Sequence, residues 1–373
     1  MSDVSRLLGT HDGDAPRRYR ILTWHVHGNY LYYLSQAPHD FYVLSTRDRG
    51  PGYSGRCGHL PWGDNVIDCP VEDLAAMEFD CILFQSREHW LHDQYLILTP
   101  EQRTLPRIYV EHDPPQEHPT DTRHPVGDED VLVVHVTPFN QLMWDNGNVA
   151  TRVIEHGVLV PPHVSYTGTL ARGVVVVNHL LQRGRRLGLD IFETMRRHVP
   201  LDLLGMAATD VGGIGEIPYP LLMEAEAEHR FFFNPIRYTS LGLAVCEAMM
   251  IGMPIVGLAT TEMVTVIRNG HNGYLDTRLD RLIDAMHMLI ADPIEAHRLG
   301  ENAQRDAQER FNIPRFVQDW NRAFEDVVRA SEGELVLTPR RDATRRNART
   351  AACVRPTQAQ AAVELRELAP SAG

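Results

Sequence analysis

The sequence predicts an α/β protein with two doubly wound domains, in which helices cover both faces of a parallel sheet. In each half of the chain, short apolar runs alternate with helical stretches of about ten residues, as is typical of βαβ units. Continuous apolar runs such as residues 131–134 favour strands that are buried on both faces of a sheet. With 373 residues, the chain is long enough for each domain to have its own core.

The first domain is predicted to span residues 1–160. Its predicted strands are residues 19–26, 41–45, 80–84, 107–111, 130–136 and 152–155. Helices are predicted over residues 28–35 and 138–144. Residues 47–65 and 113–128 are rich in Gly or Pro, which predicts two long loops.

A linker is predicted over residues 161–172, followed by a second domain over residues 173–312. The predicted strands of this domain are residues 174–178, 201–205, 231–234, 255–258 and 274–275. Its predicted helices are residues 189–198, 220–228, 242–251, 262–268, 281–291 and 293–310.

The last predicted helix covers residues 313–330. Phe316, Trp320 and Phe324 follow one another at intervals of four residues, which gives this helix an aromatic stripe. Residues 331–373 are rich in Ala, Arg and Thr, and we expect this tail to be disordered.

Composition and charge argue against several classes of protein. A formal net charge of −13 disfavours nucleic acid as the main ligand, because such ligands favour a basic face. No apolar run approaches the roughly 18 residues of a membrane-spanning helix. The polar residues 1–17 do not resemble a signal peptide. The 5 cysteines include no CxxC pair, which favours a reducing compartment, and we expect a cytoplasmic protein.

The chain contains no lysine, so every cation that contacts a phosphate must be an arginine guanidinium. Arginines are frequent in the predicted tail, where they leave two alternatives open. The tail is either solvated or makes a peripheral contact with anionic lipid or glycan. The oligomeric state is not predicted by any pattern in the sequence.

The segment from residue 231 to residue 258 carries the clearest functional pattern. It predicts a strand, a tight turn at Gly242, a helix that ends at Gly252, and a second strand. Unpaired backbone N–H groups at the beginning of a helix suit a phosphate. This segment therefore predicts an anion-binding turn.

The helix in this segment carries a carboxylate on its apolar side. Leu243, Cys246 and Met250 lie at positions i, i+3 and i+7, and we expect them to form the buried stripe. Glu247 lies on the same stripe. A buried carboxylate is unfavourable unless it is paired or hydrogen-bonded. Together, the turn and the carboxylate predict a nucleotide-diphosphate site.

The same residues resemble the signature of retaining GT-B glycosyltransferases of the family-4 type, E-x-F-G-L-x-x-x-E-A-M followed by a small residue, Gly, a variable residue and Pro. The residues in register are Leu241, Gly242, Leu243, Glu247, Ala248, Met249, Gly252 and Pro254. Residues 262–275 and 153–158 resemble further motifs of that family. The resemblance implies two Rossmann-like domains that face each other across a cleft, with the C-terminal helix crossing back to the first domain.

The resemblance also implies which residues bind the donor. Glu247 occupies the position that binds the ribose hydroxyls, while Thr239 stands where the family has a Glu that contacts the donor sugar. Residues that would supply backbone N–H groups to the diphosphate or sugar are Ser240, Leu241, Gly242 and Leu243.

The resemblance also implies which residues are catalytic. Asn178 stands where the family has an Arg that neutralises the leaving diphosphate, so Arg186 and Arg183 are the candidates for that charge. His112 matches a family His that lies near the reacting sugar. Further candidates for the donor or acceptor site are His27, Gly28 and Asn29, from a loop that contains a glycine.

The resemblance therefore implies a metal-independent, retaining hexosyltransferase. It would move a sugar from a nucleotide-diphosphate sugar to a glycan, a lipid-linked acceptor or a small molecule. No cofactor is expected, because the nucleotide sugar is a substrate. No metal site is expected, because the 19 histidines show no metal-binding spacing. Two alternatives stay open: a catalytically silent module that binds a sugar nucleotide, and a nucleotide-sugar epimerase.

Overall fold

The computed structural model describes residues 17–26, 28–58, 60–219 and 221–338. Its two sheets belong to one compact unit, whose described part ends at Thr338. Of the residues named above, His27 lies outside the described residues, and so do residues 1–16 and residues 339–373 of the predicted tail.

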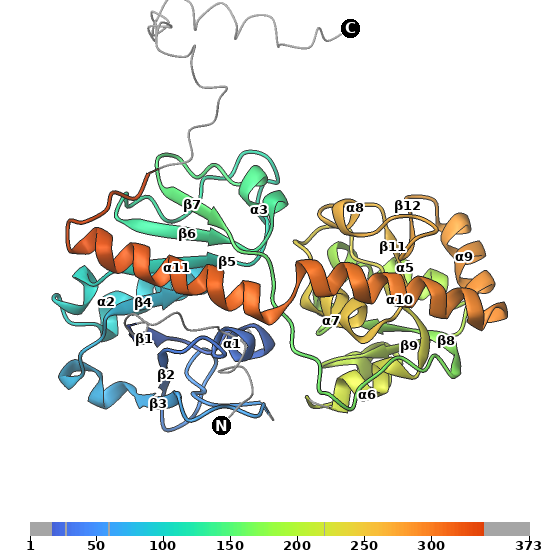
Figure 1. Ribbon diagram of the computed structural model, residues 1–373, viewed down its shortest axis with the longest axis horizontal. Helices are drawn as coiled ribbons and strands as arrows, with labels where there is room; N and C mark the ends of the chain where they lie inside the picture. The colour runs from blue at the N-terminus through green and yellow to red at the C-terminus, as the bar shows by residue number, and fades with distance from the viewer. Residues whose placement is uncertain (1–16, 27, 59, 220, 339–373) are drawn as a thin grey trace, which may run out of the picture. The chain divides into compact units, whose positions relative to one another are not determined.

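The described residues of the first half contain a seven-stranded parallel sheet in the order β3-β2-β1-β4-β5-β6-β7 (Figure 1). The strands are β1 Arg20–Thr23, β2 Asp40–Ser45, β3 Val66–Pro70, β4 Cys81–Phe84, β5 Arg107–Glu111, β6 Val131–His135 and β7 Ala150–Val153. The helices are α1 Gly28–Leu34, η2 Val71–Ala76, η3 His89–Asp93, α2 Gln94–Ile97, η4 Gln102–Thr104 and α3 Pro138–Met143.

A second parallel sheet follows, with five strands in the described residues in the order β12-β11-β10-β8-β9. The strands are β8 Leu170–Val176, β9 Leu201–Leu204, β10 His229–Asn234, β11 Ile255–Leu258 and β12 Gly273–Asp276. The helices from this half onward are α4 Leu180–Arg183, η5 Gly184–Leu187, α5 Leu189–Met195, η6 Ala208–Val211, α6 Leu221–Ala227, α7 Leu243–Ile251, α8 Met263–Val266, α9 Leu279–Ala291, α10 Pro293–Arg310 and α11 Ile313–Ser331.

Each sheet has a point at which the direction of strand addition reverses. In the second sheet the chain passes from β8 to β9 on one side and later to β10 on the other. In the first sheet β1 is flanked in the same way by β2 and β4. Open parallel sheets bind ligands at such switch points, outside the carboxyl ends of the strands. In the second sheet the switch point is formed by residues 177–188 and 235–242.

The two longest helices end the described chain and pack on different sheets. Helix α10 packs against α7 and α9, next to the second sheet. Helix α11 contacts α1, β4 and β5 of the first half (Figure 1). The predicted aromatic stripe is confirmed, because Phe316, Trp320 and Phe324 are all fully buried. The C-terminal helix therefore returns to the first sheet, as the resemblance implies.

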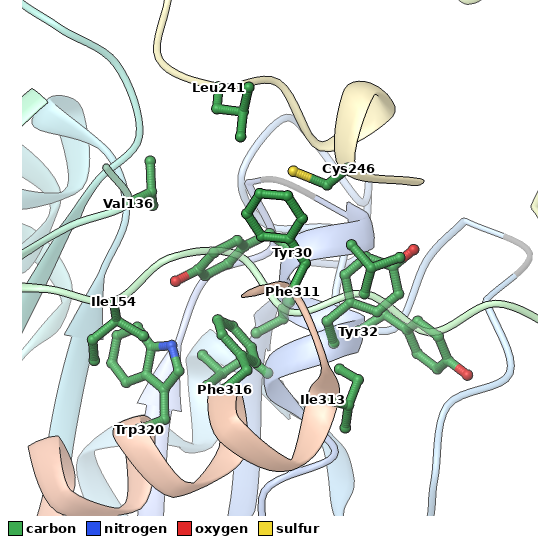
Figure 2. Close-up of a cluster of buried hydrophobic side chains, with 14 of the residues drawn as sticks. Tyr30, Tyr32, Val136, Ile154, Leu241, Cys246, Phe311, Ile313, Phe316 and Trp320 are labelled. Atoms are coloured by element: carbon green, nitrogen blue, oxygen red, sulfur yellow. The ribbon is translucent and has the colours of Figure 1, made fainter. Parts of the chain in front are cut away.

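One hydrophobic cluster contains residues of both sheets and of the last helices. Figure 2 shows Tyr30 of α1, Leu241 and Cys246 of the second half, and Phe316 of α11 in this cluster. Tyr30 and the Phe316 ring meet edge to face, with centroids 5.7 Å apart. Packing at a density typical of protein interiors fixes the first-half elements against the segment that precedes α7.

Most predicted elements are present, and the differences have physical reasons. Strand β3 was not predicted, because Asp68 and Pro70 interrupt its apolar pattern. Strand β8 begins at Leu170, inside the predicted linker, since its first three residues are exposed. The limits of the two domains stay a prediction.

The buried stripe of α7 was predicted incorrectly. Cys246 is fully buried, but Leu243 and Met250 are only half-buried. Val245, Ala248 and Ile251 are buried as well, so the helix is enclosed on most sides and has no single apolar face. The inward position of Glu247 is confirmed, because it is only 2% exposed.

Candidate functional site

Helix α7 holds Glu247 in the interior, where it contacts α1 of the first half. Asn29 Nδ2 and Tyr33 Oη both donate to Glu247 Oε1, at 2.9 and 2.7 Å. Burial raises the pKa of Glu247 above its ordinary value, and the bonds from Tyr33 and Asn29 oppose that rise. Glu247 therefore has two hydrogen-bond donors in this structure, and both come from the other half of the chain.

A second buried carboxyl group lies near Glu247. Glu226 of α6 is fully buried, and neither of its carboxyl oxygens has a hydrogen-bond partner among the described residues. Burial, followed by repulsion from Glu247, raises the pKa of Glu226 well above its ordinary value. Burial without a hydrogen-bond donor or a cation favours the protonated form of a carboxyl group.

The switch point of the second sheet brings the predicted arginines beside the segment before α7. Arg237 N donates to the Arg186 carbonyl at 3.0 Å. The Arg237 guanidinium forms a bidentate pair with Asp190, with bonds of 2.6 and 2.8 Å. Gly188 has a φ of 88°, and a Cβ there would collide with the Pro235 carbonyl oxygen. These contacts hold residues 184–190 against residues 235–237.

Two buried polar atoms lie at the junction between residues 184–190 and residues 235–238. Arg186 Nη1 and Tyr238 Oη are both buried without a hydrogen-bond partner among the described residues. Arg183 interacts electrostatically with Arg186 and with Asp113 of the first half. A buried guanidinium nitrogen needs an acceptor, and an anion supplies one. The arrangement is thus suited to a phosphate group.

The carboxyl end of β5 reaches this junction from the first half. Asp113 Oδ1 accepts a hydrogen bond of 3.1 Å from Thr239 Oγ1. Next to it, Gln85 Oε1 lies 3.2 Å from His112 Nε2, and the Tyr30 ring meets the His112 ring edge to face at 4.6 Å. The structure thus brings His112 and Thr239, which are far apart in sequence, to neighbouring positions.

Glu111, the last residue of β5, fixes the segment that carries Asp113. Its Oε1 accepts from Asp113 N at 3.0 Å, and its Oε2 lies 3.2 Å from His124 Nε2. Burial lowers the pKa of His124 to about 3, so the His124 ring is neutral and this contact is a hydrogen bond, not an ion pair. Burial also raises the pKa of Glu111 to about 8.

The structure also places four other candidate residues from the sequence, Asn29, Gly28, Asn178 and Ser240. Asn29 reaches Glu247, and Gly28 begins α1 beside His25. Asn178 Oδ1 accepts from Met206 N at 2.8 Å, so its side chain joins the loops after β8 and β9. Ser240 is buried.

The segment before α7 is also fixed through its backbone. The Leu241 carbonyl oxygen lies 2.8 Å from His156 Nε2. Gly242 is the N-cap of α7 and has no side chain. It therefore gives no side-chain hydrogen bond to the first backbone N–H groups of that helix. Leu243 is the first residue of α7 and is half-buried.

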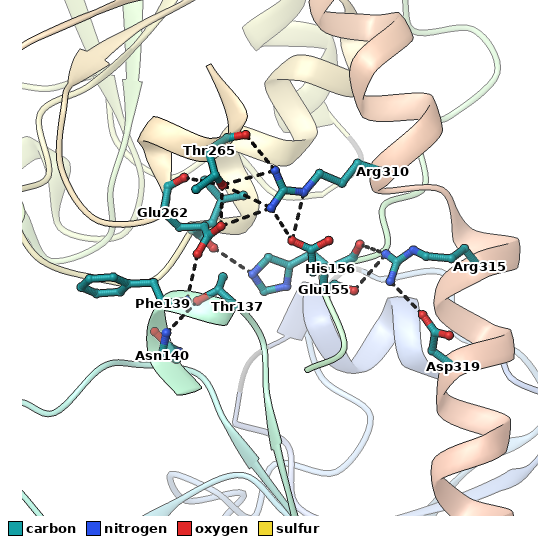
Figure 3. A network of polar contacts seen from close by, with 11 residues as sticks. Thr137, Phe139, Asn140, Glu155, His156, Glu262, Thr265, Arg310, Arg315 and Asp319 are labelled. Atoms are coloured by element: carbon teal, nitrogen blue, oxygen red, sulfur yellow. Dashed lines mark hydrogen bonds and ion pairs between the residues drawn. The ribbon is translucent and has the colours of Figure 1, made fainter. Parts of the chain in front are cut away.

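A polar network around Arg310 and Arg315 also joins the two halves of the chain (Figure 3). Arg310 Nη2 contacts Glu155 Oε1 at 2.5 Å and Glu262 Oε1 at 3.2 Å. Phe139 N, at the beginning of α3, donates to Glu262 Oε2 at 3.0 Å. Arg315 of α11 donates to the carbonyl oxygens of Glu155 and His156.

The described residues were found to contain neither a candidate metal site nor a candidate membrane-spanning helix. They contain no group of three or more His, Cys, Asp or Glu side chains that could hold a metal ion. None of the described helices combines the length and hydropathy that crossing a bilayer requires.

Sequence reasoning missed several residues of this junction. The sequence places Asp113 only in a loop and assigns no role to Arg237. Tyr33 lies in a run of aromatic and aliphatic residues, and Glu226 is one of three alternating glutamates with Glu224 and Glu228, so neither residue stands out. For Asp113 a signal did exist, since it directly follows His112 at the carboxyl end of a predicted strand.

Residues 208–306 match the family model described as glycosyl transferases group 1. A curated relative, N-acetyl-alpha-D-glucosaminyl L-malate synthase of Bacillus anthracis, is 33% identical over 93 residues. The matched region covers 24% of this chain and 24% of that protein, so the chain spans about a quarter of its relative in this comparison.

Solved structures show a similar fold over most of the chain. Sucrose-phosphate synthase from Thermosynechococcus elongatus superposes with a TM-score of 0.60 and 17% identity, covering 84% of this chain and 100% of that one. HepE from Anabaena in complex with UDP-glucose gives a TM-score of 0.60 and 15% identity, covering 83% and 100%. The chain therefore has the GT-B fold and, as the signature around Glu247 predicts, resembles the glycosyl transferases group 1.

Proposed function

We propose that the protein is a retaining glycosyltransferase, which moves a sugar from a nucleotide-diphosphate sugar to a glycan, a lipid-linked acceptor or a small molecule. The observation that supports this most is Arg186 Nη1, which is buried at the switch point of the second sheet without a hydrogen-bond partner among the described residues. A diphosphate provides the acceptor oxygens that a guanidinium binds well. HepE, which shares the fold, binds UDP-glucose and thereby suggests the first donor to test.

In the proposed reaction, the bond between the anomeric carbon and the diphosphate oxygen breaks, and that oxygen keeps the electron pair. The hydroxyl oxygen of the acceptor bonds to the anomeric carbon, and its proton passes to the departing phosphate. The sugar becomes oxocarbenium-like on the way. Fixed positive charge from Arg183 and Arg186 stabilises the negative charge that grows on the diphosphate. These guanidinium groups replace a metal ion in the proposal.

Glu247 and His112 have supporting roles in this proposal. Glu247 exchanges its bonds from Asn29 and Tyr33 for bonds from the two ribose hydroxyls, so its buried carboxylate stays satisfied. His112 orients the sugar or the acceptor from the end of β5. The backbone N–H groups of residues 240–243 contact the diphosphate.

The experiment is a panel of uridine, guanosine and adenosine diphosphates with their glucose and N-acetylglucosamine esters. Calorimetry measures binding, and proton NMR follows donor hydrolysis and the anomeric configuration of any product. We expect one nucleotide series to bind and its sugar to be transferred or slowly hydrolysed. Binding without either reaction would favour the silent module, and an altered free sugar without acceptor would favour the epimerase.

Arg186→Gln should lower kcat/KM for transfer or hydrolysis by roughly 100-fold to 1,000-fold, as expected when one donor to developing negative charge is lost. Arg185→Gln is the matched control, because Arg185 lies on the same short helix but is exposed and paired with Asp190. We expect the control to change kcat/KM by less than about twofold. Equal losses in both variants would contradict the assigned role of Arg186.

A further inference from the structure

Asp113 lies where the first half of the chain meets the segment before α7. Its Oδ1 accepts from Thr239 Oγ1 at 3.1 Å. The backbone of Asp113 is held on both sides, because its N–H donates to Glu111 Oε1 at 3.0 Å and its carbonyl accepts from Trp144 Nε1 at 2.9 Å. The first half thus fixes the position from which Asp113 reaches Thr239.

The surroundings of Asp113 are cationic and polar. Arg183 and Tyr238 both interact electrostatically with its carboxylate. Arg183 also interacts with Arg186, whose Nη1 is buried without a partner among the described residues. The Asp113 carboxylate therefore interacts with one of the two guanidinium groups to which the proposed function assigns the diphosphate, and that group interacts in turn with the other.

The side chains of Asp113 and Thr239 together offer a ligand hydrogen-bond acceptors and no donor. An ionised carboxylate only accepts hydrogen bonds. The hydroxyl proton of Thr239 is engaged by Asp113, so the Thr239 oxygen offers only lone pairs to a ligand. A sugar attached to a diphosphate would bring several hydroxyl donors to these acceptors. A carboxylate on that sugar would be repelled by Asp113.

We propose that Asp113 and Thr239 form the site that accepts the hydroxyls of the donor sugar, and that this site selects a neutral sugar over a sugar acid. The inference rests on the proposed function. Thr239 carries no charge, so the first half supplies the carboxylate, and the sugar site is complete only when Asp113 contacts the segment before α7.

The test compares three ligands: the donor found by the panel, its sugar-free nucleoside diphosphate, and its sugar-acid analogue (UDP-glucuronate if the donor is UDP-glucose). Asp113→Asn should weaken binding of the donor by about tenfold to 100-fold, because a charge-assisted hydrogen bond is lost. Binding of the sugar-free nucleotide should change less than about twofold. Wild-type protein should bind the sugar acid at least about tenfold more weakly than the donor, and Asp113→Asn should reduce that difference to below about threefold.

A charge exchange between the two positions separates this role from a structural one. Thr239→Glu places a second carboxylate against Asp113 and should weaken donor binding. The double variant Asp113→Asn with Thr239→Glu moves the charge across the contact, and we expect donor affinity within about threefold of wild type. Asp121→Asn is the control, because Asp121 is an exposed carboxylate in the same loop.

Each outcome bears on a specific part of the inference. If Asp113→Asn weakens the donor and the sugar-free nucleotide equally, or if the double variant restores nothing, Asp113 is structural and the inference is wrong. If the sugar acid binds as well as the neutral donor, the selectivity is wrong. If no nucleotide or nucleotide sugar binds, the proposed function fails, and this inference fails with it.

Discussion

At the scale of single residues, two buried carboxyl groups meet between α6 and α7. Glu247 is satisfied by Asn29 and Tyr33, whereas neither carboxyl oxygen of Glu226 has a partner among the described residues. Burial raises the pKa of both groups, and repulsion from Glu247 raises the pKa of Glu226 as well. Burial and the neighbouring Glu247 therefore both favour the protonated form of Glu226.

Replacing Glu226 tests this assignment through the pH dependence of stability. Below the ordinary carboxyl pKa, Glu226 is protonated in both the folded and the unfolded chain. As the pH rises above that value, the unfolded chain releases the proton while the folded chain keeps it, so the free energy of unfolding falls. Glu226→Met removes this fall and the unsatisfied polar group, and should stabilise the protein at pH 8 by about 1–3 kcal/mol.

Urea unfolding at pH 5 and pH 8 measures the effect. The stabilisation should be larger at pH 8 than at pH 5. Glu228→Met is the control, because Glu228 follows the same helix and is exposed. A loss of stability at both pH values would show that Glu226 makes a favourable interaction in the fold.

At the scale of elements, α7 is held in place by its close contact with α10. Gly252 ends α7 with a φ of 101°, a conformation that side chains other than glycine rarely adopt. Gly300 in α10 lies directly against the Gly252 carbonyl oxygen, and a Cβ at Gly300 would collide with it. The contact fixes the end of the helix that carries Glu247.

Gly300→Ala should therefore destabilise the protein. In an open helix this change would stabilise by about 1 kcal/mol. Here the clash with backbone should outweigh that gain and destabilise by about 1–3 kcal/mol. Gly127→Ala is the control, since a Cβ there meets nothing within 4 Å. Thermal or urea unfolding of both variants measures the difference, and a stabilised Gly300→Ala would disprove the close contact.

At the scale of the whole molecule, the two halves meet through polar contacts as well as through the shared core. Arg310, at the end of α10, contacts Glu155 after β7 and Glu262 after β11 (Figure 3). Glu262 is 2% exposed and also accepts from the N–H of Phe139. One guanidinium thus joins two segments, each of which follows a strand of a different sheet.

Arg310→Met should destabilise the protein by about 1–3 kcal/mol, because it leaves the buried Glu262 carboxylate without its cation. We expect less than for a fully buried pair, since Arg310 is 27% exposed. Arg298→Met is the matched control on the same helix, where the partner Glu295 is three residues away and Arg298 is exposed. Its effect should be below about 0.5 kcal/mol. A double-mutant cycle with Glu262→Gln measures the coupling, and a coupling near zero would contradict the role of Arg310.

Local sequence patterns predicted the elements that depend on local interactions. The aromatic stripe of α11 and the alternation around β10, α7 and β11 follow from periodicity, and both are confirmed. Periodicity failed for α7 itself, because a helix that is buried on most sides has no preferred apolar face. It also failed for β3, whose pattern contains Asp68 and Pro70.

By itself, the sequence determined that two parallel sheets form and that the last helix has one apolar face. Each depends on residues only a few positions apart. The tertiary structure alone decided that Asn29 and Tyr33 satisfy Glu247, and that Asp113 reaches Thr239. These partners are separated by 218, 214 and 126 residues. Such contacts form only after chain folding has paid the entropy of closing long loops, and no local pattern records which side chains then meet.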